Sequence, residues 1–310
     1  MFHGEEAYLR DAAVSELRRA VLGADDDVFN RKKFPAEPGG RIDLGELSDA
    51  IDTLPAFAEK TLIEVWDFDF GRNLDELVKL VSDLPEYTCV LFVCDTVEFK
   101  PDRRQKAATG LLKLARAVEF SVQEQSRLIP WICKHFESRG KKISNGDAEY
   151  LAFITGGAMT ALIGEIEKLA AYAPAAVTRR EIDALVAPVL EAEVYTLTDA
   201  VARRDIKSAG QVYAKLVAMR ESPHKIISAL SRSLRQLLLA RQLLDERRGL
   251  EDFMRAGNVK SEYGAKKLIS AARGRSAGEC RRALLMCCDA AFALNSGGGE
   301  EQITQLLLRL

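Results

Sequence analysis

The sequence predicts an α/β domain with a mostly parallel sheet at the N-terminal end, followed by two domains built of helices alone. Two observations lead to this prediction. Residues 1–120 alternate short apolar runs with amphipathic stretches, as strands and helices do when they alternate along a chain. From Ser121 onward, apolar residues recur at helical spacing only. The 310 residues, 47% of them hydrophobic, are enough to form more than one core.

The N-terminal domain is expected to span residues 1–120. Its first strand is short, because Phe2 and His3 meet the turn at Gly4 with almost nothing before them. Asn73 precedes two acidic residues and is therefore expected to cap a helix. The expected strands are Met1–His3, Asp27–Asn30, Leu62–Trp66, Thr88–Val93 and Ala117–Phe120. The expected helices are Glu6–Val21, Leu44–Leu54, Leu74–Leu84 and Arg104–Ala115.

Four capping boxes are expected to start helices in the rest of the chain. In a capping box, a serine or threonine side chain accepts a hydrogen bond from the backbone three residues later, and an acidic side chain there bonds back. The four pairs are Ser121 with Glu124, Ser144 with Asp147, Thr178 with Glu181 and Ser276 with Glu279.

A linker is expected near residues 188–193, where Pro188 and a polar turn over Glu191–Glu193 end a helical block. The helical part then divides into residues 121–188 and residues 189–310. In the last domain, Ser222 and Pro223 start a helix as N-cap and first helical residue. Its apolar stripe is Ile226, Ile227, Leu230, Leu234, Leu237 and Leu238. Further helices are expected over Ser261–Ala272, Ser276–Leu294 and Glu300–Leu310.

The net charge of −2 conceals an asymmetry. Residues 1–204 carry a net charge of −9 and residues 205–310 a net charge of +7, so the two parts favour different neighbours. No segment approaches the ~20 apolar residues of a membrane span, and no signal peptide opens the chain. We therefore expect a cytoplasmic protein that does not enter a membrane. The six cysteines form no CxxC pair and are expected to be buried free thiols.

The residues that ATP hydrolysis requires are missing. An ATP-binding loop needs glycines, a lysine and a Ser/Thr hydroxyl, whereas the first strand is followed by Gly4 and two carboxylates that would repel phosphates. Asp67 and Asp69, after the third expected strand, are expected to be turn or cap residues rather than metal ligands. The three histidines lie in different segments and form no metal cluster or catalytic triad. We expect no catalytic residue, cofactor or metal.

Phe57 follows directly on an expected helix end. It could project from the tip as an apolar anchor for a partner, the kind of residue that dominates protein interfaces. The pattern alone favours the other interpretation, in which Phe57 folds back onto the sheet as core.

The last domain is rich in cations that could meet nucleic-acid phosphates. No aromatic stacking residues lie between them, so a solvated or subunit-facing helix surface explains them equally well. The candidates for facing DNA are Lys260, Lys266, Lys267 and Arg273, and the run continues with Arg275, Arg281 and Arg282.

Several segments, in order and over essentially the whole chain, resemble the delta subunit of bacterial DNA polymerase III. They are HGEEAYLRDAAVSEL, LPAFAEKTLIEV, YTCVLFVCDTVEFKPDRRQKAATGLLKLARAVEFSVQ, ALIGEIEKLAAYA, and the stretch from RQLLLARQLL to ALNSGGGEEQITQLLLRL.

The resemblance implies an AAA+-like clamp loader subunit with a RecA-like first domain, a small helical lid and a helical collar domain. Such a subunit binds and opens the sliding clamp for loading on primed DNA during replication. It hydrolyses no ATP and has no catalytic activity of its own, although it belongs to a nucleotidyltransferase complex, a DNA-directed DNA polymerase. Its implied partners are the clamp, the ATPase subunits and delta-prime of a hetero-pentamer, and primer–template DNA.

The resemblance also reverses the expectation for Phe57. In the family an apolar pair at a helix tip enters a pocket on the clamp, and Phe57 matches the aromatic member of that pair. Ala56 falls where the other apolar residue commonly lies, a departure that weakens the second contact. Leu54 could supply part of the lost surface.

Two alternatives remain from the residues. One is a non-catalytic DNA-binding or adaptor protein that acts through the basic C-terminal helices. The other, an ATP-hydrolysing loader subunit, would need a Gly-Lys-Ser/Thr loop and a cysteine-rich zinc module, and the sequence has neither.

Overall fold

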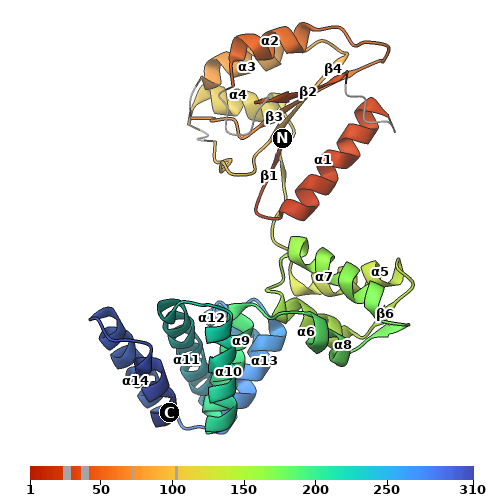
Figure 1. The fold of residues 1–310 in the computed structure, drawn as a ribbon. Helices are drawn as coiled ribbons and strands as arrows, with labels where there is room; N and C mark the ends of the chain where they lie inside the picture. The colour runs from red at the N-terminus through yellow and green to blue at the C-terminus, as the bar shows by residue number, and fades with distance from the viewer. Residues whose placement is uncertain (24–28, 36–41, 72, 102–103) are drawn as a thin grey trace. The chain divides into compact units, whose positions relative to one another are not determined.

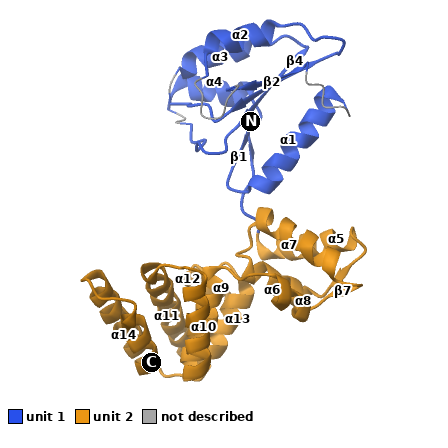
Figure 2. Ribbon diagram, in the orientation of Figure 1, with its two compact units in different colours: residues 1–123 blue, residues 124–310 orange. Residues whose placement is uncertain are grey.

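We describe the protein from a computed structural model, which describes all residues except 24–28, 36–41, 72 and 102–103. The chain forms two compact units, residues 1–123 and 124–310 (Figure 2). Each unit is described by itself.

The first unit is a five-stranded parallel sheet between two layers of helices. The strand order is β2-β3-β4-β1-β5, and every pairing is parallel. Helix α1 covers one face of the sheet, and α2, α3 and α4 cover the other (Figure 1). The elements are β1 (Phe2–His3), α1 (Ala7–Leu22), β2 (Arg31–Phe34), α2 (Leu44–Asp52), β3 (Thr61–Trp66), α3 (Leu74–Ser82), β4 (Thr88–Val93), α4 (Lys106–Leu114) and β5 (Val118–Glu119). The α/β prediction is confirmed.

Strand β3 shows why the sheet has two buried faces. Leu62 packs with Val14 of α1, whereas Ile63 and Val65 pack under α2 and α3. Alternate residues of a strand point to opposite faces, so a near-continuous apolar run is what a parallel strand between two helix layers requires.

One strand prediction in this unit is wrong. The second strand was expected over Asp27–Asn30. Residues 27 and 28 lie outside the described part, Phe29 and Asn30 form a turn, and β2 begins at Arg31. Charged residues suit β2 because it is an edge strand. Asn73 occupies the N-cap position of α3 as expected, although its backbone is left-handed (φ 52°) and its side chain makes no capping hydrogen bond.

The second unit is helical apart from two short strands. Its elements are α5 (Gln125–Glu137), β6 (Lys142–Ile143), α6 (Asn145–Ile154), α7 (Met159–Tyr172), β7 (Ala176–Val177), α8 (Arg179–Leu185), α9 (Leu190–Ala202), α10 (Ile206–Ala218), α11 (Pro223–Asp245), α12 (Leu250–Ala256), α13 (Glu262–Arg273), α14 (Ala277–Asn295) and α15 (Glu301–Arg309). The pair β6 and β7 corrects the expectation of helices alone, because strands of two residues leave no periodic signal.

The helix starts test the expected caps. Thr178 with Glu181 and Ser276 with Glu279 form complete capping boxes. The Ser144 hydroxyl accepts from the Asp147 backbone and donates to its carboxylate. The expected box at Ser121 is wrong, because α5 begins after Glu124 without a side-chain cap. The start at Ser222 and Pro223 is confirmed.

The expected polar turn at Glu191–Glu193 is also wrong. These residues form the first turn of α9, where the helix dipole favours acidic side chains. The division of the helical part near residue 188 remains a prediction.

Side chains from both sides of residue 188 pack together. The Arg179 guanidinium lies over the Tyr150 ring and donates to the Tyr263 hydroxyl (3.2 Å). The Gln125 side-chain oxygen accepts from the Glu262 backbone N–H at 2.7 Å. At Gly264 of α13, a Cβ atom would come within 3.0 Å of the Phe153 ring, so glycine permits this close approach.

The core of the C-terminal helices contains the expected α11 stripe, with Leu238 partly buried. Arg275 is buried, and its Nε donates to the last carbonyl of α9, that of Ala202, at 2.9 Å. The cysteines are free thiols, but the prediction that all six are buried is wrong, because Cys288 is exposed. No helix in the described part of the chain is long and apolar enough to span a membrane.

Candidate functional site

The C-terminal end of α2 is held at the N-terminal edge of the sheet. The Thr88 hydroxyl donates to the Ile51 carbonyl at 2.9 Å, and the Tyr87 hydroxyl donates to the Asp52 carbonyl at 3.2 Å. These bonds satisfy carbonyl groups that a helix leaves unpaired at its end. One residue later, Lys32 of β2 donates to the Thr53 hydroxyl at 3.0 Å. The chain therefore leaves α2 along a fixed path.

Asn30 fixes the next part of that path. Its side chain is 2% exposed, accepts from the Ala56 N–H at 2.6 Å and donates to the Ala56 carbonyl at 2.8 Å. Both polar groups of the Ala56 backbone are thus paired with one rigid amide, as they would be beside another strand. Sequence analysis missed this residue, because the contact joins positions 26 residues apart.

Three apolar residues project from this fixed segment. We call Leu54, Ala56 and Phe57 the apolar tip. Phe57 is fully exposed (111%), Leu54 is 71% exposed, and Ala56 is exposed as well. The core placement that the pattern favoured for Phe57 is therefore wrong.

Phe57 also has a strained backbone. Its φ of +58° lies in the left-handed region, which costs a non-glycine residue about 1–2 kcal/mol. Neither packing nor backbone preference accounts for a phenylalanine here. An exposed aromatic ring on a strained and anchored turn is typical of a contact for a partner.

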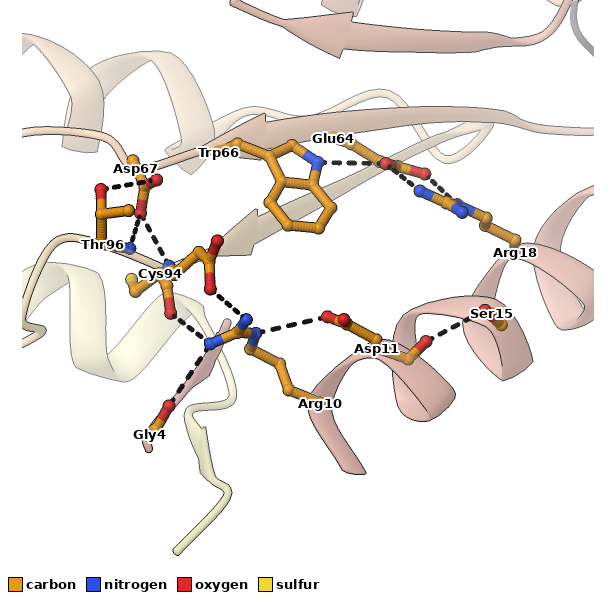
Figure 3. A network of polar contacts seen from close by, with 11 residues as sticks. Gly4, Arg10, Asp11, Ser15, Arg18, Glu64, Trp66, Asp67, Cys94 and Thr96 are labelled. Atoms are coloured by element: carbon orange, nitrogen blue, oxygen red, sulfur yellow. Dashed lines mark hydrogen bonds and ion pairs between the residues drawn. The ribbon is translucent and has the colours of Figure 1, made fainter. Parts of the chain in front are cut away.

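The opposite, C-terminal edge of the sheet is where nucleotides bind in folds of this class. Here it is closed by Arg10 of α1, which is 3% exposed (Figure 3). The guanidinium donates to the carbonyls of Gly4 (3.4 Å) and Cys94 (3.2 Å) and forms an ion pair with Asp95. Beside it, burial raises the pKa of the Glu6 carboxyl.

Asp67 organises the loop after β4. Its carboxylate accepts from the backbone N–H groups of Asp95 (2.7 Å), Thr96 (2.8 Å) and Val97 (3.2 Å). Burial opposes ionisation, but these hydrogen bonds outweigh it and lower the pKa of Asp67. Asp69 accepts from the Gly71 N–H at 2.9 Å. The prediction that both aspartates are turn or cap residues is confirmed.

A second ion pair joins α1 to the middle of β3. Glu64 of β3 is fully buried and accepts from Arg18 of α1 at 2.6 and 2.7 Å and from the Trp66 ring N–H at 3.2 Å (Figure 3). Burial opposes the charge of Glu64, yet the bonds from Arg18 and Trp66 lower its pKa. Sequence analysis missed this pair as well.

The basic candidates of the last domain have different surroundings. Lys260 and Arg273 are exposed. Lys266 forms an ion pair with Glu262 at 2.8 Å. Lys267 donates to the Thr196 hydroxyl at 3.1 Å, and burial lowers its pKa. The structure brings Lys266 and Arg273 to one groove of about 330 Å³ between α11, α12 and α13, and Lys267 does not line it.

Comparison with known proteins gives consistent matches. Residues 191–309 match the family described as DNA polymerase III delta subunit, C-terminal domain. DNA polymerase III subunit delta of Bacillus subtilis is 24% identical over 97% of this chain and 88% of the relative. A probable DNA polymerase III subunit delta of Aquifex aeolicus is 22% identical over 92% of this chain and 82% of the relative. In fold, the chain is similar to the Bacillus subtilis DNA clamp loader delta protein, with a TM-score of 0.58, 20% identity, and coverage of 99% of this chain and 93% of that one.

Proposed function

We propose that the protein is the clamp-opening subunit of a clamp loader. The match of residues 191–309 to the C-terminal domain of DNA polymerase III delta subunits supports this proposal. It binds the ring-shaped sliding clamp through the apolar tip and holds the ring open for loading on primed DNA. It acts in a hetero-pentamer with ATPase subunits and delta-prime, in the cytoplasm. The observation that carries the proposal is the full exposure of Phe57 on an anchored turn.

No covalent step is needed for this function. Binding energy at the tip stabilises an opened ring over a closed one, so the clamp population shifts by differential affinity. The residues at the C-terminal edge of the sheet support ATP binding by other subunits rather than by this chain. Arg10 occupies that edge and pairs with Asp95, so the energy of ATP enters through other subunits. The C-terminal helices join the collar of the pentamer.

The direct test is binding of the purified chain to the sliding clamp of its host on a sensor surface. Wild type is compared with Phe57→Ala and with Phe292→Ala, which removes a 75% exposed phenylalanine from α14. We expect Phe57→Ala to weaken binding about 100-fold, the effect of an interface hot spot, and Phe292→Ala to leave it unchanged. Absence of wild-type binding would refute the proposed function. Equal binding by all three proteins would refute the assignment of Phe57 as a clamp contact.

Contact with primer–template DNA is the second element of the proposal. Lys260 and Arg273 are its best candidates, because both are exposed and neither is held as Lys267 is by Thr196. The alternative function, DNA binding or adaptor activity without a clamp, uses the same basic helices. Salt-sensitive DNA binding by the full chain together with no affinity for the clamp would favour that alternative.

A further inference from the structure

We propose that the clamp-binding surface has two segments joined by Asn30, and that Phe29 is its second aromatic contact. This inference rests on the proposed function. Phe29 is 85% exposed and directly precedes Asn30. Phe57 directly follows Ala56, the residue that Asn30 binds. Phe29 and Phe57 are therefore each one residue, ~3.8 Å along the chain, from Asn30 or Ala56, the two residues joined by these hydrogen bonds.

The sheet topology brings these segments to the same edge. Strands β2 and β3 are parallel neighbours, and Arg31 lies opposite Leu62. The chain enters both strands at their N-terminal ends, so the residue before β2 and the turn before β3 emerge side by side. The Asn30 carbonyl also accepts from the Leu62 N–H at 2.8 Å, which fixes the Phe29 segment to β3.

Phe29 compensates for the small side chain of Ala56. An alanine in the apolar tip contributes little buried area, whereas a phenylalanine buries about 150–250 Å² when a pocket encloses it. Two phenylalanine rings, on segments that the Asn30 side chain holds together, then form a broader clamp-binding surface than a single ring. Preorganisation by Asn30 lowers the entropy that binding would otherwise remove from the turn.

The charge next to this surface indicates the chemistry of the partner pocket. Strand β2 continues from Asn30 with cations, of which Lys32 lies beside the apolar tip and donates to the Thr53 hydroxyl, whereas Lys33 lies over the Trp66 ring. The occupant is the sliding clamp, through an apolar pocket wide enough for two aromatic rings and with acidic groups on the β2 side. Binding should weaken as salt rises, because exposed charges are screened.

The experiment measures clamp affinity for Phe29→Ala, Phe57→Ala and Asn30→Asp, with Phe292→Ala as the control for loss of an exposed ring. We expect Phe29→Ala to weaken binding about 5- to 30-fold, as a secondary interface residue does. Asn30→Asp removes the donor to the Ala56 carbonyl and should weaken binding with both rings intact. Phe29→Trp should shift its emission to the blue when the clamp is added.

The outcomes separate the two proposals. If wild type binds and Phe57→Ala does not, but Phe29→Ala binds normally and Phe29→Trp emission does not shift, the two-segment surface is wrong and the proposed function stands. If wild type itself does not bind the clamp, the proposed function fails and this inference fails with it. Equal losses from Phe29→Ala and the Phe292→Ala control would also overturn the inference.

Discussion

The two edges of the N-terminal sheet differ in which side chains they bury and which they expose. At the C-terminal edge, Arg10 lies inside the fold and satisfies carbonyls and a carboxylate of the same chain. At the N-terminal edge, Phe57 and Leu54 leave the fold and have no apolar cover within the described chain. The C-terminal edge pairs its charged groups within the chain, whereas the N-terminal edge exposes apolar side chains to solvent. The difference means that one edge satisfies its polar groups within the fold, whereas the other leaves apolar surface available to the partner that we propose.

Removal of Arg10 should have the largest effect on stability. Arg10→Ala leaves the Gly4 and Cys94 carbonyls and the Asp95 carboxylate without their donor. Because Asp95 is half exposed, we expect a loss of about 2–3 kcal/mol of unfolding free energy, less than for a fully buried pair. Urea unfolding measures it, with exposed Arg281→Ala as the matched control. A variant as stable as the control would contradict the closed edge.

Acid should test the polar contacts of β3 and of the residue that follows it, through Glu64 and Asp67. Both have folded-state pKa values below their ordinary ones, so both stabilise the fold above pH 4.5 and lose that contribution as pH falls through the lowered values. We expect Glu64→Gln to be about 1–3 kcal/mol less stable than wild type at pH 7 and to lose less stability on acidification. Unfolding curves between pH 7 and pH 3 measure both effects. If the unfolding free energies of wild type and Glu64→Gln fell in parallel with pH, Glu64 would not contribute to the acid sensitivity of the fold.

The smallest effect on stability is expected at the exposed edge. Phe57→Gly relieves the left-handed strain of a non-glycine residue, and the added flexibility of the unfolded chain offsets part of this gain. We expect stability to rise by at most about 1 kcal/mol while clamp binding is lost. Thermal unfolding measures the gain in stability, and the sensor assay measures the loss of clamp binding. A loss of more than about 1 kcal/mol would mean that the Phe57 ring packs on the fold.

What the sequence could predict follows from the range of each interaction. Strands β3 and β4 are continuous apolar runs, and the capping boxes of α8 and α14 span four residues, so both leave local signals. Strand β2 is charged, and its stability comes from pairing with β3. The Asn30 bonds to Ala56 and the Arg18 bonds to Glu64 join residues far apart in sequence. No local pattern indicates them.

The exposure of Phe57 shows the same limit at the candidate site. An apolar residue after an amphipathic helix is usually core, and the pattern favoured that placement. Only the family resemblance pointed outward, and the structure shows how the position is held. The tip was therefore predictable by homology, whereas its support by Asn30 was not.

The contact of Arg179 with Tyr150 and Tyr263, and the bond from the Glu262 backbone to Gln125, have a consequence for how the chain melts. They tie the start of α13 to α5, α6 and α8, so unfolding either side of residue 188 breaks contacts of the other. We expect residues 124–310 to absorb heat in one cooperative transition. The predicted division near residue 188 is then not a point at which the chain comes apart when it is heated.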